Sequence, residues 1–539
     1  MAIYKQPCDE GVVLAAPPSL PPAEPARRWV LAATILGSSL TFVDGTVVNV
    51  ALPALQRELG ATVGDVQWVV EAYGLLLSAL LLVGGSLGDR FGRRRVYAMG
   101  IVLFAAASAA CGLAGSVREL VVARGLQGAG AALLVPGSLA IISASFPARE
   151  RGRAIGTWSG FSAIATAFGP VLGGWLIENR SWRWAFFMNL PVAVAVLGLL
   201  YWRVPESRDP EAAGPLDWPG AALVTIGLGG IVYGLLESSH LAWGHPRVAG
   251  ALGAGLAGLL AFGAVEARSR SPMVPLALFR SPTFTGANLL TLFLYGALGG
   301  VFFFLPLDLI QVQRYSATAA GAAGLPFIVV LFLLSRWSGG LVDRFGARRP
   351  LIVGPLIAAA GFVLLALPGI GGSYWNTIFP AMVALGLGMA VSIAPLTTTV
   401  MNAVDVRHAG IASGINNAVS RAAGLLAVAL MGVLVVHVFD AEVDRRLATV
   451  SLAPRVVAAV AAERVKLGGA EAPPEASPSE RIAIRQAVGG AFVAGFRWMA
   501  LAAAGLALAS AATAALLIDG PRAGRVPVPP TLGARAARL

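Results

Sequence analysis

Long apolar runs recur along the chain, separated by short polar or Pro/Gly-rich breaks. Each run has the roughly 20 residues that a helix needs to cross the hydrocarbon core of a bilayer. The runs are continuous, whereas a transmembrane strand would place an apolar residue at every second position. The pattern therefore predicts an all-α polytopic membrane protein with about fourteen transmembrane helices. Their expected positions are 29–51, 66–88, 95–115, 119–144, 153–177, 183–203, 217–238, 248–266, 284–311, 320–342, 350–368, 375–402, 409–437 and 496–518.

Composition and charge agree with a membrane protein. Of the 539 residues, 57% are hydrophobic and only 13% are charged, a balance that soluble globular domains do not have. A net charge of +12 can indicate nucleic-acid binding. Here, however, the arginines lie in short loops between apolar runs, where they set the orientation of the helices. We therefore expect membrane lipid, and no nucleic acid, as a partner.

The arginines also predict which side of the membrane each loop faces. They cluster after the second, fourth, eighth and tenth predicted helices and in the C-terminal tail, while the alternate short loops carry few. Because short cytoplasmic loops are enriched in Arg and Lys, we expect a plasma (inner) membrane protein with both termini in the cytoplasm. The only long loop, 438–495, is then extracellular, with charged, amphipathic stretches at 441–450, 454–467 and 479–494.

One short phrase occurs twice and relates the two halves of the chain. Gly85–Arg95 contains Asp89-Arg90-Phe-Gly92, and Gly339–Arg349 contains Asp343-Arg344-Phe-Gly346. Internal repeats are typical of transporters, whose substrate path lies where the halves meet. The predicted organisation is a disordered cytoplasmic tail (1–28), an N-terminal six-helix bundle (29–203), a linker with two additional transmembrane helices (204–283), a C-terminal six-helix bundle that includes the extracellular loop (284–519), and a cytoplasmic tail (520–539).

Further motifs occur in order along the first half. Asp44–Pro53 ends the first predicted helix, Arg124–Gly130 lies in the fourth, and Trp182–Pro191 begins the sixth. The fifth helix carries Gly156, Gly169, Pro170, Gly173 and Gly174. With Gly85–Arg95, these segments resemble the motifs of the major facilitator superfamily, specifically its fourteen-helix drug:proton antiporter branch. The resemblance covers nearly the whole chain between the tails, and it implies a major facilitator fold of two six-helix bundles plus two inserted helices.

Asp44 is the first candidate for proton coupling. A carboxylate in a membrane helix costs roughly 2.5–3.5 kcal/mol on insertion scales and is usually functional. Burial favours its protonated form and a nearby cation its ionised form, so its proton affinity depends on its surroundings. Arg124 is the expected partner, since the resemblance places the fourth helix beside the first. The alternative is a static buried ion pair that fixes helix packing.

Two further carboxylates, Glu71 and Asp308, stand where the antiporter branch more often has uncharged residues. Both are expected in the outer parts of their helices. Each could contact a cationic substrate or carry a second proton, and the alternative is an interfacial carboxylate that reaches water.

The repeated loop and the fifth helix carry two further expectations. The loop residues are interpreted as a conformational latch, in which Asp89 sits at a helix N-terminus of the other half and the arginines hold carboxylates or lipid phosphates. The alternative is an ordinary positive-inside turn. The latch residues are Gly85, Asp89, Arg90, Gly92, Arg93, Asp343 and Arg344. By resemblance, the fifth-helix glycines and Pro170 seal the halves against proton leak, and the alternative is generic membrane packing.

The sequence excludes several energy sources. No Gly-Lys-Ser/Thr phosphate loop exists, because the only lysines, Lys5 and Lys466, precede Gln and Leu. The four histidines lack metal-ligand spacing, so we expect no metal, no cofactor and no enzyme activity. A proton moving down about 100 mV supplies roughly 2.3 kcal/mol. The driving force must then be an ion gradient, a substrate gradient or another subunit, and a proton gradient suffices. Together with the resemblance to drug:proton antiporters, this predicts proton-coupled export of apolar or cationic small molecules by alternating access. The alternatives are a proton-coupled symporter that imports a specific small molecule and a non-transporting membrane sensor.

Overall fold

The computed structural model describes residues 24–208, 217–238, 241–269, 272–405, 409–450 and 452–519. Within these ranges, fourteen helices are long and apolar enough to cross a membrane, so the predicted number of spans is confirmed. The first half contains α2 (Glu24–Leu59), α3 (Val63–Phe91), α4 (Arg93–Leu113), α5 (Val117–Ser145), α6 (Ala148–Asn179), and α7 (Trp184–Phe187) with α8 (Asn189–Arg203). The second half contains α11 (Pro282–Leu307), α12 (Ala317–Ala322) with α13 (Leu325–Gly339) and α14 (Leu341–Phe345), α15 (Arg348–Ala366), α16 (Tyr374–Thr377) with α17 (Phe379–Asn402), α18 (Ala409–Leu447) and α20 (Pro478–Leu517).

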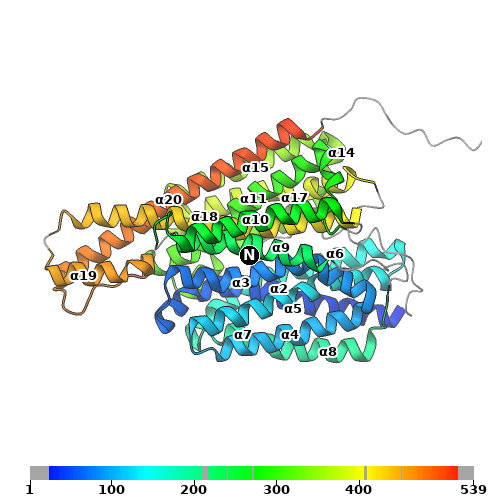
Figure 1. Ribbon diagram of the computed structural model, residues 1–539, viewed down its shortest axis with the longest axis horizontal. Coiled ribbons are helices and arrows are strands. Elements are labelled where there is room, and N and C mark those ends of the chain that lie inside the picture. Colours follow the sequence, from blue (N-terminus) through cyan, green and yellow to red (C-terminus); the bar gives the residue numbers. More distant parts are fainter. Residues whose placement is uncertain are drawn as a thin grey trace, which may run out of the picture.

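The helices form two bundles with a helix pair between them (Figure 1). In the first bundle, α3 and α4 pack on α5, and α2 packs on α6 and α8. In the second, α15 packs on α17 and α20, and α11 packs on α18 and α20. The inserted pair, α9 (Trp218–Glu237) and α10 (Pro246–Arg268), packs on itself. Since α9 also contacts α3 and α18, this pair touches both bundles.

Small residues let the helices approach closely. A Cβ added at Gly128 of α5 would lie 2.3 Å from the carbonyl oxygen of Tyr73 on α3, and one added at Gly84 would lie 2.1 Å from that of Ala132. Membrane helices gain little from the hydrophobic effect against each other, so such close van der Waals contact is a main source of their association.

Consecutive spans run in opposite directions, so the two Asp-Arg-Phe-Gly turns, after α3 and in α14, lie at the same end of the molecule. We call this the motif end. The opposite end, here called the hairpin end, carries an extension built from α18, α19 (Pro454–Glu463), the 3-10 turn η4 (Arg464–Gly469) and α20. Figure 1 shows the extension reaching past the other helices on the left.

The extension corrects the predicted long loop. The expected helices ended at 437 and began again at 496, but α18 continues to Leu447 and α20 begins at Pro478. In α18 the charged residues after 437 support the helix, because Glu442 pairs with Arg445 and Arg446 one turn on. A capping box formed by Ser477 and Glu480 starts α20. Most of the expected loop is therefore helical.

Other helix ends also differ from expectation. The helix α2 begins at Glu24, so residues 24–28 belong to α2 and not to a disordered tail. The rest of that tail, most of the segment before α9 and the C-terminal tail after Asp519 lie outside the described residues. The tenth span is broken into α12, α13 and α14, where the expectation was one helix over 320–342.

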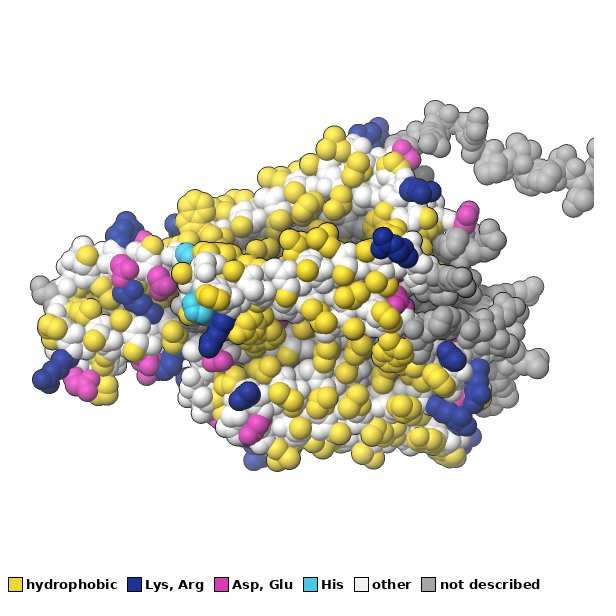
Figure 2. Space-filling model, in the orientation of Figure 1, with side chains coloured by type: hydrophobic (Ala, Val, Ile, Leu, Met, Phe, Trp, Pro, Cys, Tyr) yellow, Lys and Arg dark blue, Asp and Glu magenta, His cyan; other side chains and the backbone are white. Residues whose placement is uncertain are grey.

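The surface agrees with a chain embedded in lipid. Figure 2 shows hydrophobic side chains across the middle of the visible face and charged side chains gathered toward its two ends. Large apolar residues such as Val102, Leu260 and Leu333 are more than half exposed. An exposed apolar belt of this kind would be costly in water and is favourable against acyl chains.

Candidate functional site

The N-terminal bundle encloses a charged pair at its centre. Arg124 of α5 donates to Oδ2 of Asp44 on α2 at 2.6 Å. Asp44 is 0% exposed and Arg124 is 1% exposed, so water does not screen the pair. The two residues expected as partners are therefore in contact, and Asp44 is enclosed by protein, while their role in proton coupling stays a prediction.

Two amide side chains complete the contacts of Asp44. Its Oδ1 accepts from Nε2 of Gln127 at 2.8 Å and from Nδ2 of Asn189 at 3.2 Å. Arg124, Gln127 and Asn189 thus all donate hydrogen bonds to this carboxylate, an arrangement that suits its ionised form. Asn189 also donates to Ser108 on α4, which ties α8 and α4 to the same site.

Arg124 is held independently of Asp44. Its Nε donates to the carbonyl of Val69 on α3, and its Nη1 also donates to Oε1 of Gln127. The guanidinium lies over the ring of Tyr73, 4.3 Å from the ring centre, where a cation is attracted to the π face. A change in the charge of Asp44 would therefore act on a cation that touches α3 and α5 as well as α2.

Sequence reasoning missed the roles of Gln127, Asn189 and Ser108. Gln127 and Asn189 lie within the motif segments Arg124–Gly130 and Trp182–Pro191, so their position in a motif was the available signal. Neutral amides barely alter the hydropathy of a helix, and no pattern within one helix shows which distant carboxylate an amide faces.

Glu71 lies on α3 between Val69 and Tyr73, which both contact Arg124, but it has no hydrogen bond to the charged pair. It is 0% exposed, and neither of its carboxylate oxygens has a hydrogen-bond partner among the described residues. Gln67, one turn earlier on the same helix face, donates to the carbonyl of Val428 on α18. Glu71 therefore lies on the face of α3 that turns toward the other bundle.

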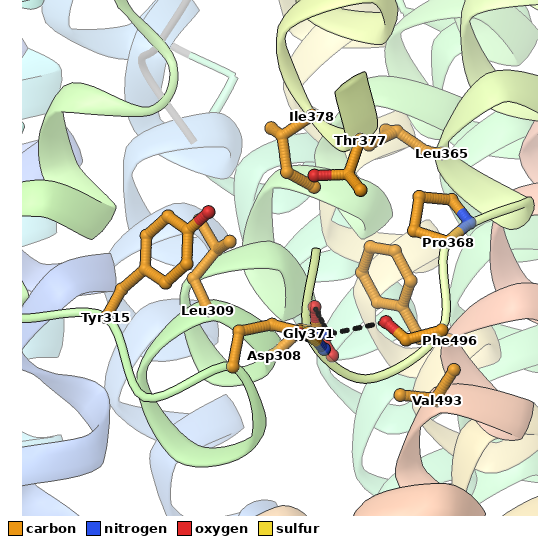
Figure 3. A pocket seen from close by; sticks show the side chains of 12 residues that line it. Asp308, Leu309, Tyr315, Leu365, Pro368, Gly371, Thr377, Ile378, Val493 and Phe496 are labelled. Atoms are coloured by element: carbon orange, nitrogen blue, oxygen red, sulfur yellow. Dashed lines mark hydrogen bonds between the residues drawn. The ribbon is translucent and has the colours of Figure 1, made fainter. Parts of the chain in front are cut away.

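Asp308 belongs to the C-terminal bundle. It begins the π-helical turn η2 (Asp308–Val312), which ends the span that starts with α11. Figure 3 shows it in a pocket beside Gly371 and Phe496. Glu71 and Asp308 thus lie in different bundles and do not form one site.

The first repeated turn binds the segment that follows α8. Glu206 accepts from the backbone N–H groups of Arg94 and Arg95 at the start of α4, at 2.9 and 3.2 Å, where a helix N-terminus favours an anion. Gly92, with φ of 110°, allows this approach, since a Cβ there would lie 2.7 Å from the Glu206 carboxyl carbon.

Asp89 accepts from Arg93, four residues on, with an N–O distance of 2.8 Å. Arg93 also donates to the carbonyl of Ala140 on α5. These contacts stay within the N-terminal bundle. The side chain of Asp343 and residues 406–408, just before α18, lie outside the described residues, so the latch between halves stays a prediction.

The glycine motif of α6 lies where the two bundles meet. A Cβ added at Gly173 would lie 2.7 Å from Val47 on α2, and one at Gly174 would lie 2.4 Å from the carbonyl oxygen of Ala317 on α12. Pro170 closely approaches Gly321 of α12 in the same way. Gly169 faces Thr46, whereas Gly156 has open space where a Cβ would be.

Further hydrogen bonds join the bundles at the hairpin end. Glu178 at the end of α6 accepts from the hydroxyl of Thr318 on α12 at 2.5 Å. Gln311 of η2 donates to Gln56 of α2 at 2.7 Å. With the Gln67 contact to α18, these bonds hold the two bundles together at this end.

Comparison with known proteins agrees with this architecture. Residues 34–428 match the family model described as Major Facilitator Superfamily. The chain is 36% identical over 417 residues to a tetracenomycin C resistance and export protein of Streptomyces glaucescens, covering 76% of each chain. It is 37% identical over 413 residues to a puromycin resistance protein of Streptomyces alboniger, covering 76% of this chain and 82% of that protein.

Solved structures support the fold alone. A bacterial homolog of the human lysosomal transporter Spinster, in an inward-facing and unoccupied conformation, matches with a TM-score of 0.64 and 19% identity. The match covers 93% of this chain and 100% of that one. The family model spans more than half of the chain, and the export and resistance proteins are more than 30% identical over about three quarters of it. The chain therefore belongs to the major facilitator superfamily of membrane transporters.

Proposed function

We propose that this protein is a proton-coupled exporter of apolar or cationic small molecules that works by alternating access in the plasma membrane. Export is supported by its relatives, which are named as antibiotic or multidrug resistance and export proteins. The buried Asp44–Arg124 pair is the observation that carries proton coupling. A carboxylate inside a membrane protein costs free energy and usually has a function.

The proposed cycle uses the charge of Asp44. When Asp44 is ionised, its contacts with Arg124, Gln127 and Asn189 hold α2, α5 and α8 together. A proton on Asp44 would remove its attraction for Arg124 and turn one carboxyl oxygen from an acceptor into a donor. These helices would then repack, which gives the two charge states of the site different preferences for the inward-open and outward-open forms.

We assign the motif end to the cytoplasm, because short arginine-rich loops favour that side. The hairpin end is then extracellular, and the contacts of α6 with α12 and of Gln56 with Gln311 close that side. Glu71, buried on the α3 face that turns toward α18, is proposed to meet a cationic substrate or a second proton during the cycle.

The test is efflux in cells that lack other exporters, first across a panel of antibiotics and organic cations, with and without a protonophore. A compound found there is then followed in vesicles with an imposed pH difference. Asp44→Asn should abolish proton-driven transport when vesicles with equal amounts of folded protein are compared. Glu475→Gln, which neutralises an exposed carboxylate at the hairpin end, should transport normally.

Proton-driven transport at the native rate by Asp44→Asn would refute the role of this carboxylate. Uptake of the compound together with protons, instead of exchange against them, would replace the exporter with the symporter alternative. Binding without any flux would favour the sensor.

A further inference from the structure

Asp308 is a buried carboxylate that the proposed proton site does not use. Its residue is 4% exposed, and its Oδ1 has no hydrogen-bond partner among the described residues. Its Oδ2 has one long contact, 3.4 Å from Nε2 of Gln313. A buried carboxylate with so few donors has lost its hydration without replacement, which is costly for the ionised form.

The surroundings of Asp308 provide no cation. None of the residues that line its pocket is Lys, Arg or His, and no ion pair among the described residues includes it. Two arginines adjoin pocket residues in sequence, and neither forms an ion pair with Asp308 among the described residues. Arg497, next to Phe496, donates to the carbonyl of Ala366, and Arg314, next to Gln313, is exposed.

The pocket is shaped by an irregular backbone. Asp308 begins a π-helical turn, a distortion that often occurs at functional sites. Gln313 crosses the pocket, because its Nε2 donates to the carbonyl of Gly369 and its Oε1 accepts from the N–H of Gly371. Figure 3 shows the loop of Gly371 next to Asp308, with Phe496 of α20 beside it. Gly371, with φ of 87°, is exposed, so the pocket lies next to the surface at the hairpin end.

The size and chemistry of the pocket limit what it can hold. Its free volume is about 20 Å³, which is enough for one water-sized species and far too small for a drug. The lining also includes Tyr315, Thr377 and Gly369, which carry hydroxyl or carbonyl oxygens of the hard kind that such cations prefer. A single carboxylate suits a single positive charge, and no cluster of three or more His, Cys, Asp or Glu occurs in the described part of the chain.

We propose that Asp308 and the oxygen atoms around it form a binding site for one small monovalent cation, of the size of sodium or ammonium, that enters from the hairpin end. The site is separate from Asp44, because its pocket is lined only by residues of the C-terminal half. A proton on Asp308 would compete with the cation, since it removes the charge that binds it.

The site is connected to the contact between the bundles. The same π-helical turn carries Gln311, which donates to Gln56 of α2, and Gly468 and Gly469 of the extension lie against Gln311. A cation that orders this turn would therefore stabilise the closed hairpin end, and its loss would favour opening.

The binding test uses the full-length protein in lipid nanodiscs at pH 8. Saturable binding of ²²Na⁺ is measured by scintillation proximity, with unlabelled Na⁺, K⁺, NH₄⁺ and choline as competitors. We expect saturable binding that small cations displace and choline does not. Asp308→Asn should reduce bound ²²Na⁺ at least tenfold at the concentration that half-saturates the native protein, while Glu475→Gln should bind normally.

A second measurement needs no variant. The unfolding midpoint of the native protein should be higher in NaCl or NH₄Cl than in choline chloride at equal ionic strength, and Asp308→Asn should lose this difference. The proposal is overturned if no small cation binds or raises the midpoint, or if folded Asp308→Asn binds like the native protein. Because binding is measured without transport, the result is independent of whether Asp44 couples protons.

Discussion

The Asp44 carboxylate and the Arg124 guanidinium are each buried in protein, so each depends on the other for charge compensation. Removing one charge from a buried pair leaves the other uncompensated and costs about 3–5 kcal/mol. We therefore expect Asp44→Asn and Arg124→Gln each to lower the free energy of unfolding by about that amount. The double variant should recover most of the loss, as measured by denaturant unfolding in detergent.

Transport measurements on the same three variants can distinguish a role of the pair in proton coupling from a role in helix packing. If Asp44 carries the proton, the double variant is stable and still fails to move substrate against its gradient when a pH difference is imposed. Proton-driven transport by the stable double variant would identify the pair as a static packing element.

The pairing of Asp44 with Arg124 could be predicted because the resemblance places the fourth helix beside the first. The charges alone did not decide it, since Glu71 and Asp308 are also carboxylates within apolar runs. The neutral donors Gln127 and Asn189 could not be assigned, since their contacts depend on how α2, α5 and α8 are oriented around the carboxylate. The same holds for Asp308, whose Oδ1 has no hydrogen-bond partner among the described residues and which begins a π-helical turn that the apolar pattern does not reveal.

At the scale of single elements, α6 shows what a small-residue stripe does in this protein. Gly174 faces the backbone of Ala317 on α12 so closely that any side chain would push the bundles apart. Gly174→Leu should therefore impair closure of the hairpin end and increase proton leak into vesicles without substrate, as read by a pH-sensitive dye. Gly160→Leu is the matched control, because nothing lies within 4 Å of a Cβ at that position of the same helix.

A leak that rises equally in both variants would mean that α6 glycines serve packing in general and not the seal.

The sequence predicted the middle of each helix better than its ends. Hydropathy placed the middle of each span, because a run of about 20 apolar residues has few alternatives. It failed in the extension, where α18 and α20 continue through charged turns held by pairs such as Glu442 with Arg446.

At the scale of the whole molecule, the two bundles share an architecture but differ in chemistry. In the first bundle α2 and α5, its first and fourth spans, meet through an ion pair. In the second bundle the first and fifth spans, α11 and α18, meet through neutral bonds from Asn416 to Asn288 and Thr291. The inserted α9–α10 pair touches α3 and α18, one helix from each bundle. Motion of the bundles against each other must therefore change the contacts of α9, so the inserted pair should move during the transport cycle.

Which end of the molecule faces the cytoplasm decides from which side the proposed sites are reached. Labelling at two exposed positions can test this orientation. Ser479 lies in the extension at the hairpin end, and Arg208 follows α8 at the motif end. In a version without Cys8 and Cys111, a membrane-impermeant maleimide should label Ser479→Cys in intact cells if the motif end is cytoplasmic, as its arginine-rich loops predict. Arg208→Cys should react only after the cells are opened. Labelling of Arg208→Cys in intact cells would invert the orientation, and the pocket of Asp308 would then take its cation from the cytoplasm.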